Sequence, residues 1–144
     1  MAVTALDTTV LYAAADESDR RHDDGLAIVK GVNEGTLPNG AVVDYVLAET
    51  MNGVVRNVSH GAAVDYLDRI ERNDRFEVGR LGTEAFATGK AVFRKHDRLS
   101  LVDGLVVGYM RDRGLEYVYS FDAGFDGIDG ITRLPTADNP YAPG

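Results

Sequence analysis

Apolar residues in this chain follow two patterns: short compact runs, and longer stretches in which they recur every three or four positions. The short runs have the length and composition of buried strands. They predict strands over residues 3–6, 41–43, 76–78, 116–121 and 128–134. The first run ends at Asp7 and the fourth at Asp122, which places an acid directly after each of these two strands.

The longer stretches have the spacing of one apolar helix face. The most regular of them starts at Ser100, carries apolar residues from Val102 to Met110, and ends at Gly114, a residue that favours the left-handed conformation at a helix C-terminus. Ser59 and Thr83 are the expected N-caps of two further helices. The other expected helices cover about 19–33, 46–58, 59–70 and 83–93.

Strands that alternate with helices of this length imply parallel pairing through right-handed crossovers. The sequence therefore predicts an α/β fold, a sandwich with a mainly parallel central sheet. No internal repeat or low-complexity block is present, so we expect one domain over residues 1–134. Three of the four prolines lie in the last ten residues, which predicts a loose, Pro-rich tail over 135–144.

Composition changes this picture in one respect, the character of the surface. The 144 residues carry a formal net charge of −8, with 16 Asp against 7 Glu and only 3 Lys against 12 Arg. An Asp-rich, Lys-poor surface keeps a protein hydrated in concentrated salt, which indicates a halophilic source. The chain has no cysteine, and this excludes disulfide scaffolds, thiolate zinc sites and cysteine nucleophiles.

We expect neither a targeting segment nor a membrane segment in this chain. Its N-terminal residues lack the positive and apolar regions of a signal peptide, and its longest uncharged apolar stretch, 104–110, is too short to span a bilayer. We therefore expect a cytoplasmic protein that does not bind membranes. A basic face of the kind that binds nucleic acid is not visible either.

Four acids occupy positions where a surface role is a poor explanation. Asp7 and Asp122 follow strands, and the carboxyl ends of parallel strands are where ligands bind in such sheets. Glu49 and Asp103 are each the only charge within an apolar helical run. Because an isolated buried carboxylate is costly, it is normally paired, hydrogen-bonded or bound to a cation. A hard divalent ion such as Mg²⁺ would satisfy several of these acids at once.

Each acid taken alone also fits a structural role. Ser100 and Asp103 have the spacing of a capping box, in which the acid only bonds back to the start of its helix. Asp7 and Asp122 could begin turns or cap the following helix. Glu49 could bury its stem and extend its carboxylate into solvent. The four acids together favour a metal site more than any one of them does.

Other kinds of site fit the sequence poorly. The three histidines lack the spacings of zinc motifs. The acids of the 122–130 segment are spaced by four and then three residues, whereas an EF-hand loop needs alternating ligands. An aspartyl-nucleophile phosphatase would need a second acid at Thr9, and a receiver domain would need an acidic pair and a late lysine.

Four motifs, in order along the chain, resemble those of the PIN-domain family. Residues 6–11 (LDTTVL) resemble its opening strand and turn, and residues 47–49 (LAE) resemble the segment of its second acid. Residues 99–106 (LSLVDGLV) resemble its helix-borne third acid, and residues 119–126 (YSFDAGFD) its last strand and acid. The resemblance covers the chain up to about residue 134.

The resemblance implies a Rossmann-like α/β/α sandwich and a ribonuclease that depends on Mg²⁺ or Mn²⁺. It implies that Asp7, Glu49, Asp103 and Asp122 ring one pocket as catalytic, metal-binding residues, with Asp7 and Asp103 as the most direct ligands. Asp126 is an outer candidate. The metal would activate a water for attack on a phosphodiester. The expected supporting hydrogen-bond donors are Thr8, Thr9 and Ser100.

By its size, the chain is most similar within that family to VapC-type toxins of toxin–antitoxin pairs. This implies an RNA substrate, an antitoxin protein as partner, and a homodimer. Because RNA is a polyanion and the chain is acidic, bound metal and local arginines must supply the attraction. Two alternatives stay open: a catalytically silent PIN-like module that binds RNA or protein, and an RNA-maturation nuclease. The candidate arginines are Arg20, Arg21, Arg56, Arg94 and Arg98.

Overall fold

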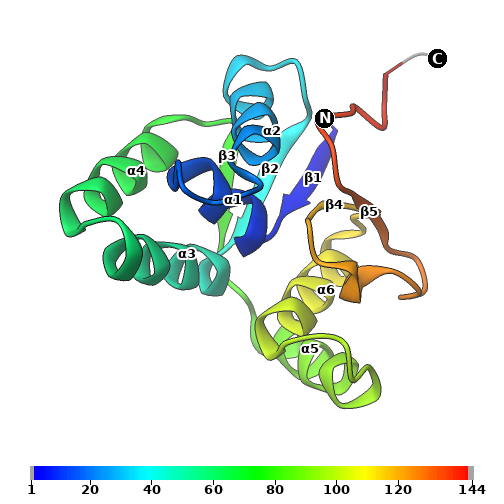
Figure 1. The fold of residues 1–144 in the computed structure, drawn as a ribbon. Coiled ribbons are helices and arrows are strands. Elements are labelled where there is room, and N and C mark those ends of the chain that lie inside the picture. The colour runs from blue at the N-terminus through cyan, green and yellow to red at the C-terminus, as the bar shows by residue number, and fades with distance from the viewer. Residues whose placement is uncertain (1, 143–144) are drawn as a thin grey trace.

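The computed structural model describes residues 2–142 and has a central sheet with helices on both faces (Figure 1). The strands are β1 (Val3–Leu6), β2 (Asn39–Val43), β3 (Phe76–Gly79), β4 (Tyr117–Tyr119) and β5 (Thr132–Leu134). The helices are α1 (Thr8–Ala15), α2 (His22–Glu34), α3 (Asp44–Asn57), α4 (His60–Arg72), α5 (Thr83–Lys95), α6 (Leu101–Arg113) and the short 3-10 helix η1 (Ala123–Phe125).

The sheet has the strand order β3-β2-β1-β4-β5, and every pairing in it is parallel. This confirms the predicted α/β class with a parallel sheet. β1 lies at the centre, where Leu6 pairs with Tyr119 of β4. The order of the strands reverses at β1, so the carboxyl ends of β1 and β4 form the position at which ligands bind in open α/β sheets. Asp7 follows one of these strands and Ser120 the other.

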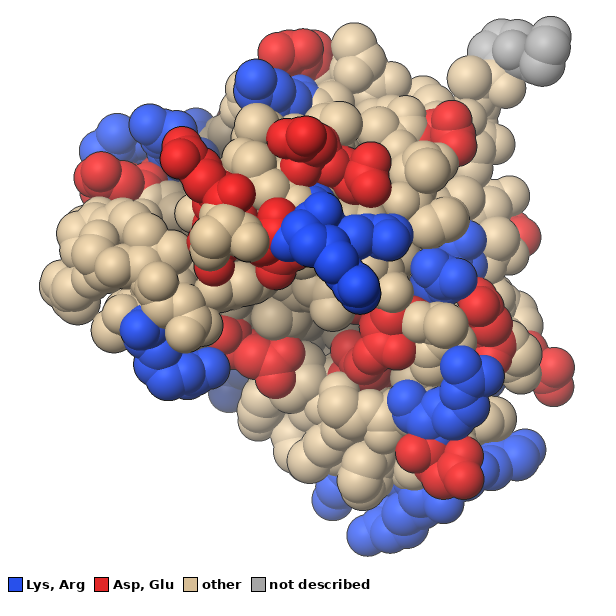
Figure 2. All heavy atoms as spheres, viewed as in Figure 1, with Lys and Arg blue, Asp and Glu red and all other residues tan. Residues whose placement is uncertain are grey.

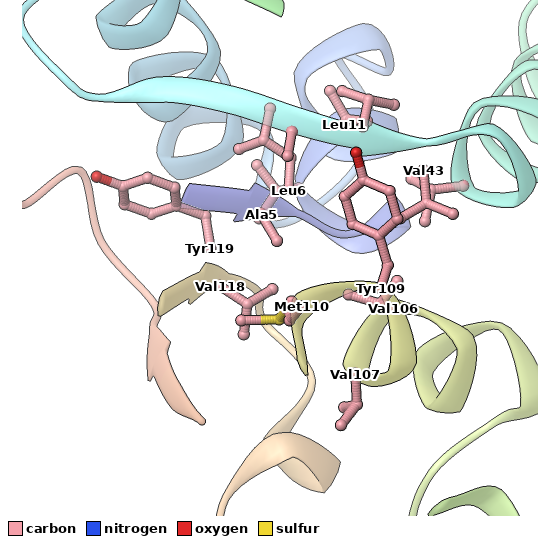
Figure 3. Close-up of a cluster of buried hydrophobic side chains, with 14 of the residues drawn as sticks. Ala5, Leu6, Leu11, Val43, Val106, Val107, Tyr109, Met110, Val118 and Tyr119 are labelled. Carbon is pink, nitrogen blue, oxygen red and sulfur yellow. The ribbon is translucent and has the colours of Figure 1, made fainter. Parts of the chain in front are cut away.

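Side chains alternate between the two faces of β1 and β4 and so build two cores (Figure 3). Ala5 and Val118 face α6, where Val106 and Met110 cover them, and all four are buried. Leu6 lies on the opposite face with Leu11 of α1. The burial of both faces explains why the strands appear in the sequence as continuous apolar runs.

Helix α6 is held against the sheet by an unusually close partner, α5. A Cβ on Gly108 would lie 2.3 Å from the carbonyl oxygen of Ala85, so the two helices approach at a contact that only glycine permits. The apolar stripe predicted for α6 is buried on the sheet side, and glycines face α5 on the other side. This packing fixes the first turn of α6, which carries Asp103.

The predicted helix ends are confirmed in three cases and wrong in one. Ser59 and Ser100 are N-caps whose hydroxyls accept backbone N–H groups, and Gly114 ends α6 in the left-handed conformation. Thr83 is not an N-cap: α5 is capped by Gly82, and Thr83 is its first residue. The helix α1 was not predicted, because it consists of two threonines and an unbroken apolar run and so lacks a helical stripe.

The last described residues lie against the sheet. The Tyr119 hydroxyl donates to the carbonyl of Asp138 (2.7 Å), and the ring of Tyr141 packs edge-on against Tyr117 at 5.3 Å. The domain boundary at residue 134 stays a prediction, and residues 143–144 of the proposed tail lie outside the described residues. Within residues 2–142 every helix is too short or too polar to cross a membrane.

Candidate active site

Three aspartates from separate elements meet at the carboxyl ends of β1 and β4. Asp7 directly follows β1 and is completely buried, while Asp122 follows β4 and caps η1. Asp103 lies in the first turn of α6 with 6% of its surface exposed. The structure therefore brings together three of the four predicted carboxylates.

Asp7 is held by hydroxyl and backbone donors. Its Oδ1 accepts from the hydroxyl of Thr9 (2.6 Å) and from the N–H of Val10 (3.3 Å), and its Oδ2 accepts from the hydroxyl of Ser120 (2.5 Å). The bond from Val10 makes Asp7 the N-cap of α1, so the capping role considered for this residue is also present. Burial raises the pKa of Asp7 to about 6, and these hydrogen bonds offset that increase only in part.

The side chain of Asp122 lies beside the carboxyl group of Asp103 and disfavours its charged form. Burial raises the pKa of Asp103 to about 8, with the negative charge of Asp7 and the bond and charge of Asp122 acting in the same direction. The Asp103 N–H also donates to Ser100 Oγ (3.1 Å), which is the predicted capping bond. Asp103 therefore both takes part in the capping of its helix and belongs to the group of Asp7, Asp103 and Asp122, which we call the acid pocket.

The position of Asp122 depends on the packing of η1. Oδ1 of Asp122 accepts from the N–H of Gly124 (2.8 Å), and its own N–H donates to Ser120 Oγ (2.9 Å). A Cβ on Gly124 would lie 2.4 Å from the carbonyl oxygen of Arg98, so η1 packs directly on the loop that precedes α6. This contact brings Asp122 beside Asp103.

Glu49 and Asp126 lie outside this group. Glu49 is exposed on α3, and no hydrogen bond or ion pair joins it to the three aspartates in the described part of the chain. Asp126 forms a two-point ion pair with Arg133, at 3.0 Å from Nε and 3.1 Å from Nη2. This pairing holds the pKa of Asp126 below its ordinary value.

Two residues of the site were missed by the sequence analysis. Ser120 is buried, and its single hydroxyl serves both Asp7 and the N–H of Asp122. Arg133 of β5 bonds to the carbonyl of Ser120 (3.3 Å) as well as to Asp126. The available signal was the position of Ser120 near the carboxyl end of the strand predicted over 116–121, two residues before the candidate acid Asp122.

The donor set of the pocket fits a hard divalent cation. Its ligating atoms are carboxylate oxygens, and no lysine or arginine among residues 2–142 bonds to Asp7, Asp103 or Asp122. With the side chains as they stand, no three acidic or histidine side chains in this range enclose a space suited to an ion. Binding of Mg²⁺ or Mn²⁺ would require Asp103 to be deprotonated, against its raised pKa.

Two surface features accompany the site. On the face drawn in Figure 2, acidic side chains flank a hollow, and basic side chains lie along its edge. A separate groove of about 1030 Å³ lies between α2 and α4 and does not include the three aspartates. Its apolar floor is formed by Leu26, Val29 and Ile70.

Comparison with known proteins gives a family match and a set of similar folds. The sequence model of the PIN domain matches residues 4–131. VapC20 of Mycobacterium tuberculosis, a toxin that cleaves the sarcin–ricin loop, is 23% identical with a TM-score of 0.72, over 85% of this chain and 91% of that chain. No curated protein matches the chain.

Two of the other similar structures are complexes. VapBC2 of Rickettsia felis, bound to a promoter DNA fragment, is 14% identical with a TM-score of 0.69, over 92% of this chain and 98% of that chain. A toxin–antitoxin complex from Klebsiella pneumoniae is 19% identical with a TM-score of 0.64, over 94% and 98%. At these identities the similarity establishes the fold.

Proposed function

Since the chain belongs to the PIN domain family, we propose that it is a ribonuclease that depends on a divalent metal ion and acts as the toxin of a toxin–antitoxin pair. The observation that carries the proposal is the meeting of the buried Asp7 and Asp103 with the half-buried Asp122, without a bonded cation among residues 2–142. Carboxylates with raised pKa values in a pocket at the strand ends are typical of functional sites.

In this proposal Asp7 and Asp103 are the most direct metal ligands, and Asp122 completes the site or binds through water. Glu49 is the fourth carboxylate, and its exposed side chain on α3 lies free of the hydrogen bonds that fix Asp7. A bound Mg²⁺ or Mn²⁺ would supply an activated water and neutralise the leaving oxygen of the phosphodiester. Thr9 and Ser120 orient both oxygens of Asp7 for this role.

Cleavage of RNA tests the proposal directly. A mixed RNA pool is incubated in high salt with the wild-type chain and Mn²⁺ or Mg²⁺. Two parallel controls replace the metal ion by EDTA or the wild-type chain by the Asp103→Asn variant. We expect cuts that require metal and that disappear in the variant while its fold is retained. Failure of the freshly refolded chain both to cut RNA and to bind Mn²⁺ would reject the proposal in favour of a silent binding module.

We also propose an antitoxin as partner, because two similar structures are complexes of this kind. The groove between α2 and α4 supports this, since its apolar floor and charged edges suit one face of an amphipathic helix. The exposed valines of the α3–α4 hairpin support association of two copies, as expected for a homodimer. These are Val55, Val58 and Val64, each more than 40% exposed.

A role in RNA maturation uses the same active site and is the second candidate. The two roles differ in the effect of RNA cleavage on the cell, whereas the active-site residues are the same in both. Growth arrest on expression, relieved by a co-expressed partner, would support the toxin. Survival with defined changes in one RNA would support the maturation nuclease.

A further inference from the structure

The guanidinium of Arg21 lies over the ring of Phe121, with its central carbon 4.5 Å from the ring centroid. Arg21 directly precedes α2, and Phe121 directly precedes Asp122. The contact therefore joins the loop between α1 and α2 to the loop that carries an acid of the pocket.

Hydrogen bonds fix this ring relative to the acids. The N–H of Phe121 donates to Thr9 Oγ1 (3.0 Å), and the same hydroxyl donates to Asp7 Oδ1 (2.6 Å). The hydroxyl of Thr9 thus bridges Phe121 and Asp7, and Phe121 is the residue directly before Asp122. Because Arg21 stacks on this ring, its positive charge is held at the edge of the pocket and not on a freely moving side chain.

The charge of Arg21 is not committed to a protein carboxylate. Its Nε lies 3.9 Å from Oδ2 of Asp24, and because the two side chains are 40% and 59% exposed, this ion pair contributes little. This Nε is buried and has no hydrogen-bond partner among residues 2–142. Arg133 differs, because Asp126 engages two of its nitrogens at 3.0 and 3.1 Å. No hydrogen bond or ion pair within residues 2–142 engages the two Nη nitrogens of Arg21, so these donors stay available to a ligand.

The chemistry of this pair suits a nucleic-acid strand. A guanidinium presents a planar set of donors that matches the oxygens of a phosphate, and stacking on an aromatic ring holds that plane in place. A chain with a net charge of −8 also needs a local cation to admit a polyanion. On the basis of the proposed nuclease function, we infer that Arg21, held on Phe121, binds a backbone phosphate of single-stranded RNA beside the acid pocket.

Binding of RNA at several salt concentrations tests the inference. A fluorescently labelled single-stranded RNA of mixed sequence is titrated with the chain in Ca²⁺, and gels verify that it stays intact. Each phosphate contact on a single strand adds about 0.7 to the slope of log affinity against log salt. We expect Arg21→Ala to lower this slope by about 0.7 and to weaken binding about tenfold. Arg21→Lys keeps the charge and should retain most of the slope.

Arg113 provides a matched control. Its guanidinium lies over Tyr109 at 4.9 Å and is 3.8 Å from Asp112, so it has the same kind of stacking and the same kind of weak ion pair. It lies at the far end of α6, about 15 Å along the helix from Asp103. Arg113→Ala should leave the slope unchanged. Phe121→Leu removes the ring but not the charge, and should weaken binding less than Arg21→Ala.

The outcomes separate this inference from the proposed function. An unchanged slope in Arg21→Ala, or an equal loss in Arg113→Ala, would overturn the inference even if the wild-type chain cuts RNA and binds Mn²⁺. A wild-type chain that neither binds nor cuts RNA would overturn the proposed function and the inference with it. Mn²⁺ affinity should be the same in wild type and Arg21→Ala, since Arg21 contacts none of the three aspartates.

Discussion

The hydroxyl of Ser120 donates to Oδ2 of Asp7 across 2.5 Å, although the two residues are 113 positions apart in the chain. The parallel pairing of β1 with β4 creates this relationship. Because Leu6 pairs with Tyr119, the residues that follow them, Asp7 and Ser120, meet at the carboxyl ends of the two strands. The same hydroxyl accepts the N–H of Asp122. One buried serine therefore sets the separation between two acids of the pocket.

Substitution of this serine should weaken metal binding. Ser120→Ala leaves Asp7 Oδ2 and the N–H of Asp122 without their partner, so we expect Mn²⁺ affinity to fall about tenfold. We also expect a loss of about 1–3 kcal/mol in the free energy of unfolding. Titration calorimetry and urea unfolding measure the two effects. Ser59→Ala, at an exposed N-cap, should cost about 1 kcal/mol and leave Mn²⁺ affinity unchanged.

Substitution by valine should destabilise the fold at Thr9 but not at the adjacent Thr8. Thr9 Oγ1 bonds to both Asp7 and Phe121, so Thr9→Val should destabilise the fold by about 1–3 kcal/mol. Thr8 Oγ1 is buried without a partner among the described residues, so Thr8→Val should be neutral or stabilising. Thermal unfolding in EDTA compares them. A larger loss for Thr8→Val would contradict this assignment of the two hydroxyls.

The sequence predicted the strands and most helices because a buried sheet and amphipathic helices leave clear apolar patterns. It singled out Asp7 and Asp122 because they follow strands, and Asp103 because a lone acid in an apolar run needs a partner. The same lone-acid argument selected Glu49, which is exposed and lies apart from the three aspartates. It could not predict Arg133, whose contacts depend on the pairing of β4 with β5 and on the turn of η1. It also missed α1, because the six residues that follow its two threonines form an unbroken apolar run without a polar face.

Arg133 should act on the site by holding the loop after β4. Its nitrogens join Asp126 and the carbonyl of Ser120, which lie on either side of Asp122. Arg133→Met keeps the length of the stem but removes these bonds, so we expect weaker Mn²⁺ binding and a lower kcat, with Arg133→Lys intermediate. Arg111 bonds to the nearby carbonyl of Asp129 from an exposed position, and Arg111→Met is the matched control. Equal effects of the two methionine variants would reject a specific role for Arg133.

Metal should stabilise the fold through Asp103. A ligand at 100 times its Kd adds about 2.7 kcal/mol to the free energy of unfolding, which corresponds to several degrees in Tm for a chain of this size. We expect Mn²⁺ to raise the Tm of the wild-type chain and of Asp112→Asn, an exposed acid on the same helix. Asp103→Asn should show little or no increase. A full increase in that variant would remove Asp103 from the set of ligands.

The metal-free chain should lose stability as the pH rises from 6 to 8. The pKa of Asp103 is about 8 in the folded chain and near 3.8 when unfolded, so the folded state binds the proton more tightly across this range. Stability then falls with rising pH by up to about 1.4 kcal/mol per pH unit for this group. Asp7, with a pKa of about 6, contributes the same effect mainly below pH 6.

Urea unfolding in EDTA at pH 6, 7 and 8 isolates the contribution of Asp103, because every other titrating group is common to wild type and Asp103→Asn. The variant should therefore gain stability relative to wild type as the pH rises, and parallel curves would show that Asp103 is already ionised at pH 6. Saturating Mn²⁺ should reduce or reverse the dependence in the wild-type chain, because a metal ion binds the deprotonated carboxylates. The three aspartates therefore destabilise the metal-free fold more at pH 8 than at pH 6, and they bind metal more tightly at pH 8 for the same reason: their carboxylates are deprotonated.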